Sequence, residues 1–310
     1  MGKYEHIVNR DELGMTINQI LRANFTFSRR FKTKIKFQEL IDLNGVKSKG
    51  FIKPNLGDLI SVRLPIEENN FPPEDIPIDI VYEDSDILII NKQAGITVHP
   101  TKGHPNNTLA NGITSYIEKT NQNFKIRFCN RLDMDTSGLI IVAKNSNIQN
   151  EISKQMQRDL VLKKYIALVY GIIEKDNFII DLPVGRPDPS SPKRSVLSID
   201  KGGKNAVTGV KVIKRFYNKK LSEPFDGVTL AELTLYTGRT HQIRIHLSHI
   251  NHPIIGDGLY SNIKDEKMTR QALHARYIKF KHPTSGEEME LNAEIPSDIN
   301  LLIKRLSSLI

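Results

Sequence analysis

The segment Asn130–Leu139, with the sequence NRLDMDTSGL, gathers the residue types of this chain that are best suited to chemistry. It holds two carboxylates, a guanidinium, two hydroxyls and a glycine between two apolar stretches, Phe124–Phe128 and Leu139–Val142, that are predicted to be strands. A packed core does not need so many polar groups in one short loop, whereas a functional site does. An aspartate that is held ionised and aimed at a substrate can act as a nucleophile or a general base.

Two aspartates of this segment compete for that role. Asp133 and Asp135 are two residues apart, so in an extended loop both side chains would point to the same side. The residue types alone therefore do not choose between them. In the alternative interpretation, without catalysis, the loop is an Asx-turn in which Asp135 or Thr136 binds backbone amides.

Further motifs follow along the chain. Lys163–Gly171 reads KKYIALVYG, Tyr236–His249 reads YTGRTHQIRIHLSH, and INHPIIGDGLY comes directly after it. In this order, and together with RLDMDTSG, these motifs resemble the RluA/RluD-type pseudouridine synthases. YEDSDILIINKQAGITVHP (Tyr82–Pro100) and LHARYIKFKHPTSGE (Leu273–Glu287) extend the resemblance over most of residues 78–296. The resemblance implies an RNA pseudouridine synthase, which is an isomerase, on the α+β fold of that family.

The resemblance also implies roles for three residues. Asp133 matches the catalytic aspartate and is expected to be the nucleophile. Tyr165, in KKY, matches the residue that stacks on the target base and can move a proton at C5. Arg244, in HQIR, matches the basic partner of the aspartate, because a guanidinium favours a charged carboxylate and can bind it through two hydrogen bonds. Tyr165 as a plain core aromatic, Arg244 as the partner of another acid, and Arg239 in its place remain alternatives.

The implied reaction needs no cofactor. Pseudouridine formation breaks the N1–C1′ bond of a uridine, turns the base and rejoins it through C5, without redox change, metal or nucleotide triphosphate. The base must first leave the RNA stack, and stacking on an aromatic side chain stabilises it there by ~1–3 kcal/mol. The histidines that crowd one region lack the i, i+4 spacing of zinc-binding helices, so no metal site is expected: His241, His246, His249 and His252.

Composition agrees with an RNA enzyme. The 310 residues have room for one large and one small domain. The net charge of +9 favours a polyanionic partner. A single cysteine, Cys129, excludes a disulfide framework and a multi-cysteine zinc site, and is expected to be a small buried hydrophobe. No apolar run approaches ~18 residues and the amino terminus lacks a signal-peptide core, which predicts a cytoplasmic location without a membrane partner.

Residues 1–65 are predicted to form a small α/β domain, and they hold 12 Lys/Arg against 6 Asp/Glu, a balance that favours a polyanionic partner. Helical spacing at Thr16–Phe25 and at Ser28–Ile41, with Ser28 as N-cap, precedes short strands within Asp42–Leu64. Those strands are expected to meet at Asn44-Gly45 and Gly57-Asp58 turns. A basic helix followed by LNGV…KPNLGDLISV resembles the S4 RNA-binding domain. The alternative is a solvated basic helix in a helper domain.

A linker and a catalytic domain are expected after it. Residues 66–77 hold three prolines and four acids without a base, which predicts an extended, self-repelling linker. Residues 78–310 are the predicted catalytic domain, α+β with a mainly antiparallel mixed sheet flanked by helices, because strands outnumber helices and are often joined as hairpins. The predicted elements are the hairpin Ile78–Tyr82 with Ile87–Asn91, the helices Thr108–Thr120 and Ser146–Asp159, the latter capped by Asn145 or Ser146, and the strands Tyr165–Val169, Val207–Phe216, Val228–Leu235 and Tyr277–Lys281.

Structured RNA is the expected partner, and the S4-like segment favours ribosomal RNA over tRNA. No protein partner is indicated. The basic residues predicted to contact RNA are Arg29, Arg30, Lys32, Arg131, Arg186 and Arg239. Gly185–Ser195 is expected to be an exposed loop, either along the RNA backbone or as plain surface.

Two positions depart from the family pattern, and two other functions compete. Asn130 stands where histidine is common and Gln93 where proline is usual, and both are expected to affect geometry rather than chemistry. A non-catalytic RNA-binding or RNA-folding protein on the same fold is the competing function. A glycosidase fits poorly, since that chemistry normally uses two acids that flank the bond.

Overall fold

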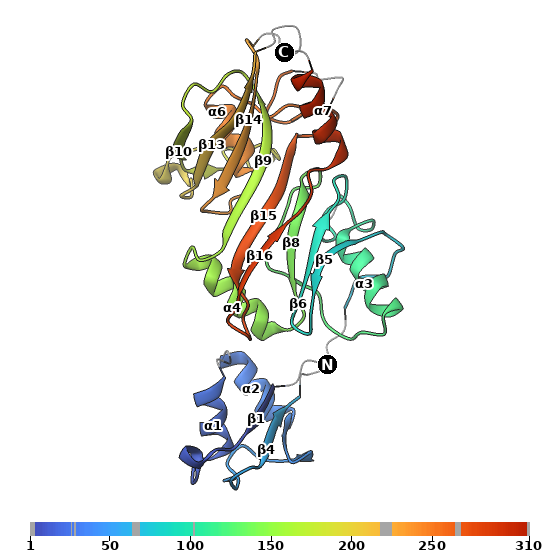
Figure 1. The fold of residues 1–310 in the computed structure, drawn as a ribbon, viewed down its shortest axis with the longest axis vertical. Helices are drawn as coiled ribbons and strands as arrows, with labels where there is room; N and C mark the ends of the chain where they lie inside the picture. The colour runs from blue at the N-terminus through green and yellow to red at the C-terminus, as the bar shows by residue number, and fades with distance from the viewer. Residues whose placement is uncertain are drawn as a thin grey trace.

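The computed structural model describes residues 4–25, 27, 29–63, 69–101, 103–217, 225–263 and 268–308. Within these residues the strands form a four-stranded sheet in the order β1-β4-β2-β3, a ten-stranded sheet and a two-stranded ribbon. Figure 1 shows the small sheet at one end of the molecule and the ten-stranded sheet running through the rest. None of the described helices is both long and apolar enough to span a membrane.

The small sheet is antiparallel throughout and is covered by two short helices. Its strands are β1 (Tyr4–Ile7), β2 (Ile41–Leu43), β3 (Val46–Lys47) and β4 (Leu59–Val62), and its helices are α1 (Ile17–Asn24) and α2 (Arg29–Phe37), with a 3-10 turn, η1 (Arg10–Glu12). Side chains of both helices share one apolar cluster with the sheet, including Ile17, Ile20, Phe31, Ile35 and Ile60.

The predicted turns of this region are present, but its second helix was predicted too long. Asn44 and Gly45 both have positive φ, at 50° and 83°, as a tight hairpin turn requires. The helix predicted to reach Ile41 ends at Phe37, because Ile41 pairs with Val62 in the sheet. The predicted N-cap, Ser28, lies outside the described residues.

The large sheet confirms the predicted α+β class with a mainly antiparallel mixed sheet. Its order is β10-β13-β14-β9-β15-β8-β6-β5, with β16 beside β15 and β7 beside β8, and only the β15–β8 pairing is parallel. The strands are β5 (Asp79–Glu83), β6 (Ile87–Lys92), β7 (Arg127–Phe128), β8 (Ser137–Ala143), β9 (Leu162–Tyr170), β10 (Asn177–Asp181), β13 (Val207–Phe216), β14 (Val228–Leu235), β15 (Leu273–Lys281) and β16 (Glu288–Asn292). The ribbon pairs β11 (Val184–Gly185) with β12 (Ser195–Val196). It closes the loop that was predicted at Gly185–Ser195.

The continuous apolar runs of β6 and β8 are explained by burial on both faces. Leu88 and Ile140 face the cluster that holds α3 (Leu109–Lys119), whereas Ile89 and Ile141 face the cluster that holds α4 (Ser146–Gln157). Both helices begin at caps, since the side chains of Thr108 and Asn145 accept hydrogen bonds from the first-turn amides. The other described helical segments are α6 (Gln242–His249), α7 (Ser297–Ser307) and the short η2 (Ile199–Lys201).

Strand β15 joins the two halves of the large sheet. One of its edges pairs with β9, while the other pairs first with β8 and then with β16. The contact with β8 depends on Gly138, whose φ is +119° and whose missing Cβ would lie 2.3 Å from the carbonyl oxygen of Ala275. No other residue type fits there without moving a strand.

The segment between the sheets is irregular, as predicted, but it is bound rather than free. Asn69 donates to the carbonyl of Phe124 and accepts from the amide of Ile126, at 2.8 Å each. Asp75 forms an ion pair with Lys119 of α3, so that its charge is compensated instead of repelling its neighbours. Residues 66–68 of the predicted linker lie outside the described residues.

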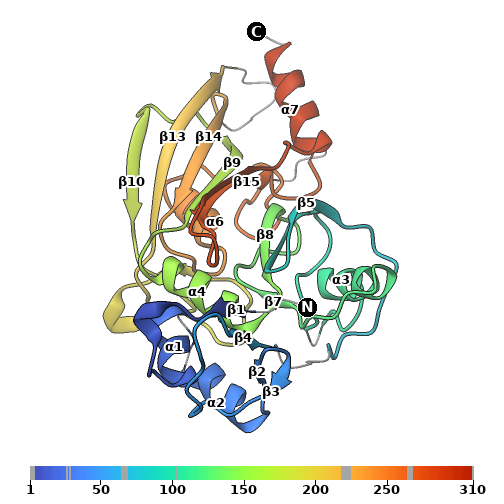
Figure 2. The ribbon, with the colours of Figure 1, turned by 60° about the horizontal axis from the view of Figure 1, so that its bottom comes forward.

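A contact also links the small sheet to the large one. Asn147 of α4 donates to the hydroxyl of Tyr4 on β1 at 3.3 Å, and Figures 1 and 2 both show the small sheet next to α4. Burial raises the pKa of Tyr4 to about 12.

Candidate active site

The segment between β7 and β8 forms a turn, which separates the two candidate aspartates. The amide of Thr136 donates to the carbonyl of Asp133 at 3.1 Å, so the loop turns here and is not extended. The carboxylate of Asp133 lines a cleft of about 470 Å³ and is 26% exposed. Asp135 is not among the residues that line this cleft, and its carbonyl accepts from Arg270. The two carboxylates are therefore not interchangeable.

A buried lysine holds this turn through hydrogen bonds to backbone carbonyls. The ammonium of Lys92, at the end of β6, donates to the carbonyls of Gln93, Ile96 and Met134 at 2.7, 3.0 and 2.8 Å. Burial lowers the pKa of Lys92 to about 7. Sequence reasoning missed this residue, because a lysine that ends a strand is normally read as a solvated side chain. Its position two residues after the apolar run Ile87–Ile90 was the available signal.

Arg244, on α6, connects Asp133 to a second carboxylate. Its Nη1 donates to Oδ2 of Asp133 at 3.1 Å, while its Nε and Nη2 donate to the two oxygens of Asp257 at 2.7 and 2.8 Å. The pairing of Arg244 with Asp133 is present, but the two-pronged bond goes to Asp257. Arg239 does not replace it, since its side chain donates to the carbonyl of Asn205.

Asp257 was not predicted as a site residue, although it lies in the INHPIIGDGLY motif. It is 1% exposed, and its Oδ1 also accepts from the amides of Leu259 and Tyr260. Burial opposes ionisation of Asp257, but the bonds from Arg244 and the two amides outweigh it and hold the pKa of this carboxyl below its usual value. Asp257 therefore fixes the guanidinium of Arg244 through Nε and Nη2, which leaves Nη1 to donate to Asp133.

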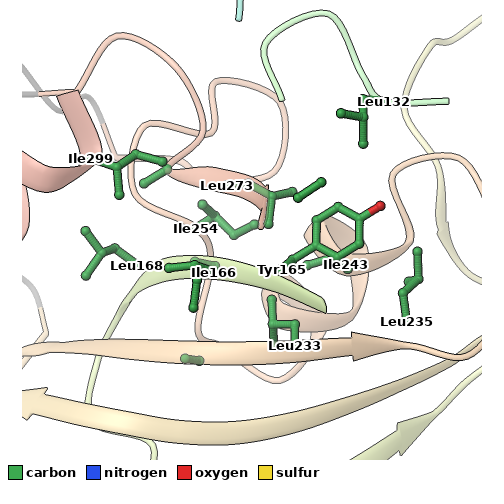
Figure 3. Packing of buried hydrophobic residues seen from close by; sticks show 14 of the residues in the cluster. Leu132, Tyr165, Ile166, Leu168, Leu233, Leu235, Ile243, Ile254, Leu273 and Ile299 are labelled. Carbon is green, nitrogen blue, oxygen red and sulfur yellow. The ribbon is translucent and has the colours of Figure 1, made fainter. Parts of the chain in front are cut away.

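Tyr165 stands on β9 and forms part of the wall of the same cleft. Figure 3 shows its ring among Leu235, Ile243 and Leu273, with the hydroxyl at the outer end, on the side of Leu132. Burial, together with the charge of Asp133, raises the pKa of Tyr165 above its usual value. The phenol is therefore protonated at neutral pH.

Comparison with known proteins decides the family of this site. The family model described as RNA pseudouridylate synthase matches residues 86–249, which is more than half of the chain. The chain belongs to the RNA pseudouridylate synthase family. It is 37% identical over 273 residues to the uncharacterized RNA pseudouridine synthase YlyB of Bacillus subtilis (strain 168), covering 87% of this chain and 86% of that protein. It is 35% identical over 313 residues to ribosomal large subunit pseudouridine synthase D of Escherichia coli (strain K12), covering 96% and 92%.

A solved structure supports the same fold. Human RNA pseudouridylate synthase domain containing 1 superposes with a TM-score of 0.57 at 24% sequence identity, over 76% of this chain and 97% of that one. The enzyme class that the motifs predicted, an RNA pseudouridine synthase, is thereby confirmed.

A hydrogen-bond chain of this synthase ends beside Asp133. The amide of Arg194 donates to the hydroxyl of Tyr260 at 3.0 Å, and that hydroxyl lies 2.9 Å from Nδ1 of His241. Burial lowers the pKa of His241. Its other ring nitrogen, Nε2, is 3.8 Å from Oδ2 of Asp133. His241 has a left-handed backbone, with φ of 57°, in front of α6.

Two of the other histidines in this region have structural contacts. His246 bonds to Thr208 and to the carbonyl of Leu182, and His252 bonds to the carbonyl of Tyr170. The described residues contain no group of three or more His, Cys, Asp or Glu side chains placed to hold a metal ion.

One departure from the family pattern shapes the Asp133 loop, and the other contacts the segment before β5. Asn130 donates to the carbonyl of Leu139 at 3.0 Å and accepts from the amide of Ile141 at 2.8 Å, so it ties the entry of the Asp133 loop to β8. Gln93 donates to the carbonyl of Pro77. Cys129 is half-buried at the cleft and follows β7 rather than lying within it, and burial raises its pKa to about 12.

The structure brings only some of the predicted RNA-binding residues together. Arg131 and Arg239 are exposed and line the cleft. Arg186 is exposed in the β11–β12 loop, where it donates to the carbonyl of Ser191, and Lys32 is exposed on α2. The side chains of Arg29 and Arg30 lie outside the described residues.

Proposed function

We propose that this synthase isomerises uridines in structured ribosomal RNA and that Asp133 is its catalytic carboxylate. The observation that carries the proposal is the pairing of a half-buried Asp133 with Arg244 in the cleft that Tyr165 lines. The other carboxylate on Arg244, Asp257, is almost fully buried and fully engaged. The relative in Escherichia coli, named a ribosomal large subunit pseudouridine synthase, favours ribosomal RNA.

The cleft suits a nucleotide that has left the RNA stack. Its volume of about 470 Å³ lies within the ~300–1,000 Å³ of small-ligand sites. Tyr165 offers an apolar ring for the base, and its raised pKa makes it a hydrogen-bond donor rather than a base. Asp133 is then the group that attacks the nucleoside or accepts a proton from it. The proton lost at C5 is matched by the proton gained at N1, so no external reactant is consumed.

Mapping of pseudouridines tests this proposal. Unmodified ribosomal RNA is incubated with the enzyme and new pseudouridines are located along it, with unmodified tRNA in parallel. We expect defined sites in ribosomal RNA, no product with Asp133→Asn, and nearly unchanged RNA binding by that variant. Asp135→Asn is the matched control and should keep its activity.

Three outcomes would contradict the proposal. Sites in tRNA alone would identify tRNA as the substrate. Rescue of a deletion strain by Asp133→Ala as efficiently as by the wild type would favour a non-catalytic RNA-binding or RNA-folding protein. Product from Asp133→Asn would assign the chemistry to another group.

We further propose that residues 1–65 are an S4-like RNA-binding domain. The support is the basic composition of this segment and the exposure of Lys32 and Lys36 on α2. Each phosphate contact steepens the salt dependence of binding. Lys32→Glu with Lys36→Glu should therefore weaken RNA binding and lower the slope of log K against log salt. Lys304→Glu on α7, at the other end of the molecule, is the control (Figure 1). An unchanged slope in the α2 variant would contradict RNA contact by this helix.

A further inference from the structure

Lys163 is a basic residue of the cleft that has no assigned role. It lies on β9, two residues before Tyr165, so the alternation of a strand places both side chains on one face of the sheet. Both residues line the cleft that holds Asp133. Lys164, between them, projects to the opposite face, where its Nζ lies 3.1 Å from Oε1 of Glu232 and 5.6 Å from the centre of the Tyr277 ring.

Lys163 differs from Lys164 in having no ion-pair partner among the described residues. No carboxylate of the described residues lies within salt-bridge distance of its ammonium, and no described acceptor receives a hydrogen bond from it. Before Lys163 in the chain, the cleft is lined by apolar or weakly polar residues such as Phe128, Cys129 and Met156, and by polar ones that include Arg131 and Asp133. Burial lowers the pKa of Lys163, and Asp159, beyond the end of α4, offsets this only in part. A partly desolvated ammonium without a partner is unfavourable unless a ligand supplies the anion.

The substrate can supply only one kind of anion there. The uracil base and the ribose are neutral at neutral pH, whereas every linkage of the RNA backbone carries one negative charge. A uridine that enters the cleft brings its own phosphate groups with it. Arg131 and Arg239 are exposed at the same cleft and are available to phosphates farther along the strand.

We propose that Lys163 binds a phosphate group attached to the flipped uridine. This inference rests on the proposed function and deepens it, since it assigns a backbone subsite within the same cleft. Lys163 holds the nucleotide through its charge while Tyr165, two residues away on the same face, supports the base. Lys163 is thus a binding residue that does not touch the reacting atoms.

A pairwise cycle between protein and RNA tests the proposal. The RNA is a stem-loop around whichever uridine the wild-type enzyme modifies, made with ordinary linkages or with one neutral methylphosphonate on the 5′ or the 3′ side of that uridine. The proteins are the full-length wild type, Lys163→Met, Lys163→Arg and Lys164→Met. Binding is measured in an Asp133→Asn background, and single-turnover rates are measured with Asp133 present.

We expect Lys163→Met to weaken binding of the ordinary RNA by about 10- to 100-fold, as for loss of a charged hydrogen bond. Lys163→Arg should restore most of this loss, and Lys164→Met should change binding by less than about 3-fold, as for an exposed pair. One methylphosphonate should weaken wild-type binding by the same factor as Lys163→Met. It should then have no further effect on Lys163→Met.

Two results would overturn the inference. If both methylphosphonates weakened Lys163→Met as much as they weaken the wild type, the lysine would not contact either phosphate. If Lys163→Met bound ordinary RNA like the wild type, there would be no subsite at this residue. Product formation by the wild type on the ordinary stem-loop reports separately on the proposed function. The Lys163→Arg variant distinguishes a charge effect from a folding defect.

Discussion

Two near-isosteric substitutions should separate the two carboxylates that share Arg244. Asp133→Asn removes a charge from a side chain that is 26% exposed and that receives one hydrogen bond of 3.1 Å from Arg244. Asp257→Asn removes a charge from a side chain that is 1% exposed and that receives two, at 2.7 and 2.8 Å. We expect Asp133→Asn to lose activity while its stability is retained. Asp257→Asn should lose part of its activity and part of its stability.

The magnitudes follow from burial. Removal of one partner from a buried ion pair costs about 3–5 kcal/mol. The lower end applies to Asp257→Asn, because asparagine keeps one oxygen that can accept from the guanidinium. The Asp133–Arg244 pair is only partly buried, and in Asp133→Asn the guanidinium keeps its two bonds to Asp257, so the loss should stay below the ~3 kcal/mol of a fully buried pair. Displacement of Arg244 by ~1 Å in Asp257→Asn is expected to slow catalysis by ~100-fold.

Two assays measure these quantities. Urea denaturation gives the free energy of unfolding. Tritium released from RNA that carries [5-³H]uridine, in a single turnover, gives the rate of the reaction, because the C5 proton is lost. Asp135→Asn, outside the cleft, should resemble the wild type in both assays. A loss of ~3 kcal/mol or more in the free energy of unfolding of Asp133→Asn would refute the reasoning, because that is the loss expected of a buried pair. A wild-type rate in Asp257→Asn would also refute it.

Three further predictions concern the frame around the site. Gly138→Ala should lower the free energy of unfolding by at least ~3 kcal/mol, because its Cβ would lie 2.3 Å from the Ala275 carbonyl oxygen. Gly286 also has positive φ but open space around it, so Gly286→Ala should lower the free energy of unfolding by only ~1 kcal/mol. Equal urea midpoints for the two variants would contradict this prediction. Burial lowers the pKa of His274 to about 4, whereas the unfolded chain takes up this proton near its ordinary pKa of ~6.5. As the pH falls from ~6.5 towards 4, the free energy of unfolding should therefore fall by ~3 kcal/mol. Urea denaturation at each pH measures this decline. In His274→Gln the decline should be smaller by the same amount, and an unchanged decline would exclude His274 as its source. Asn130→Ala should lose ~1–3 kcal/mol and slow the single turnover, because both of its hydrogen bonds to β8 disappear; a stable, fully active variant would show that the tie is dispensable.

Local patterns predicted much of this fold. The apolar runs predicted β6 and β8, the helical spacing predicted α3 and α4, and one of the two proposed caps of α4, Asn145, is the observed one, because these signals act within a few residues. The parallel pairing of β15 with β8 could not be predicted in this way. It joins His274 to Ser137, and nothing near either residue specifies so distant a partner.

The site shows the same division. Asp133, Tyr165 and Arg244 were found through motifs, and the structure places all three at one cleft. Asp257 and Lys92 were missed because their importance comes from burial. A Gly-Asp pair ordinarily indicates a turn and a terminal lysine ordinarily indicates solvent, until the rest of the fold encloses them.

The position of β15 determines the order in which this enzyme can be completed during synthesis. This strand lies between β9 and β8, yet all of its sheet neighbours except β16 precede it in the chain. A growing chain that ends at Asp257 already contains Asp133, Arg244 and Asp257. It does not yet contain β15, the strand that joins the two halves of the large sheet. The N-terminal segment that we propose binds RNA is made first. A nascent chain could therefore hold RNA before it can modify it, and a truncation before Leu273 should leave two half-sheets and no enzyme.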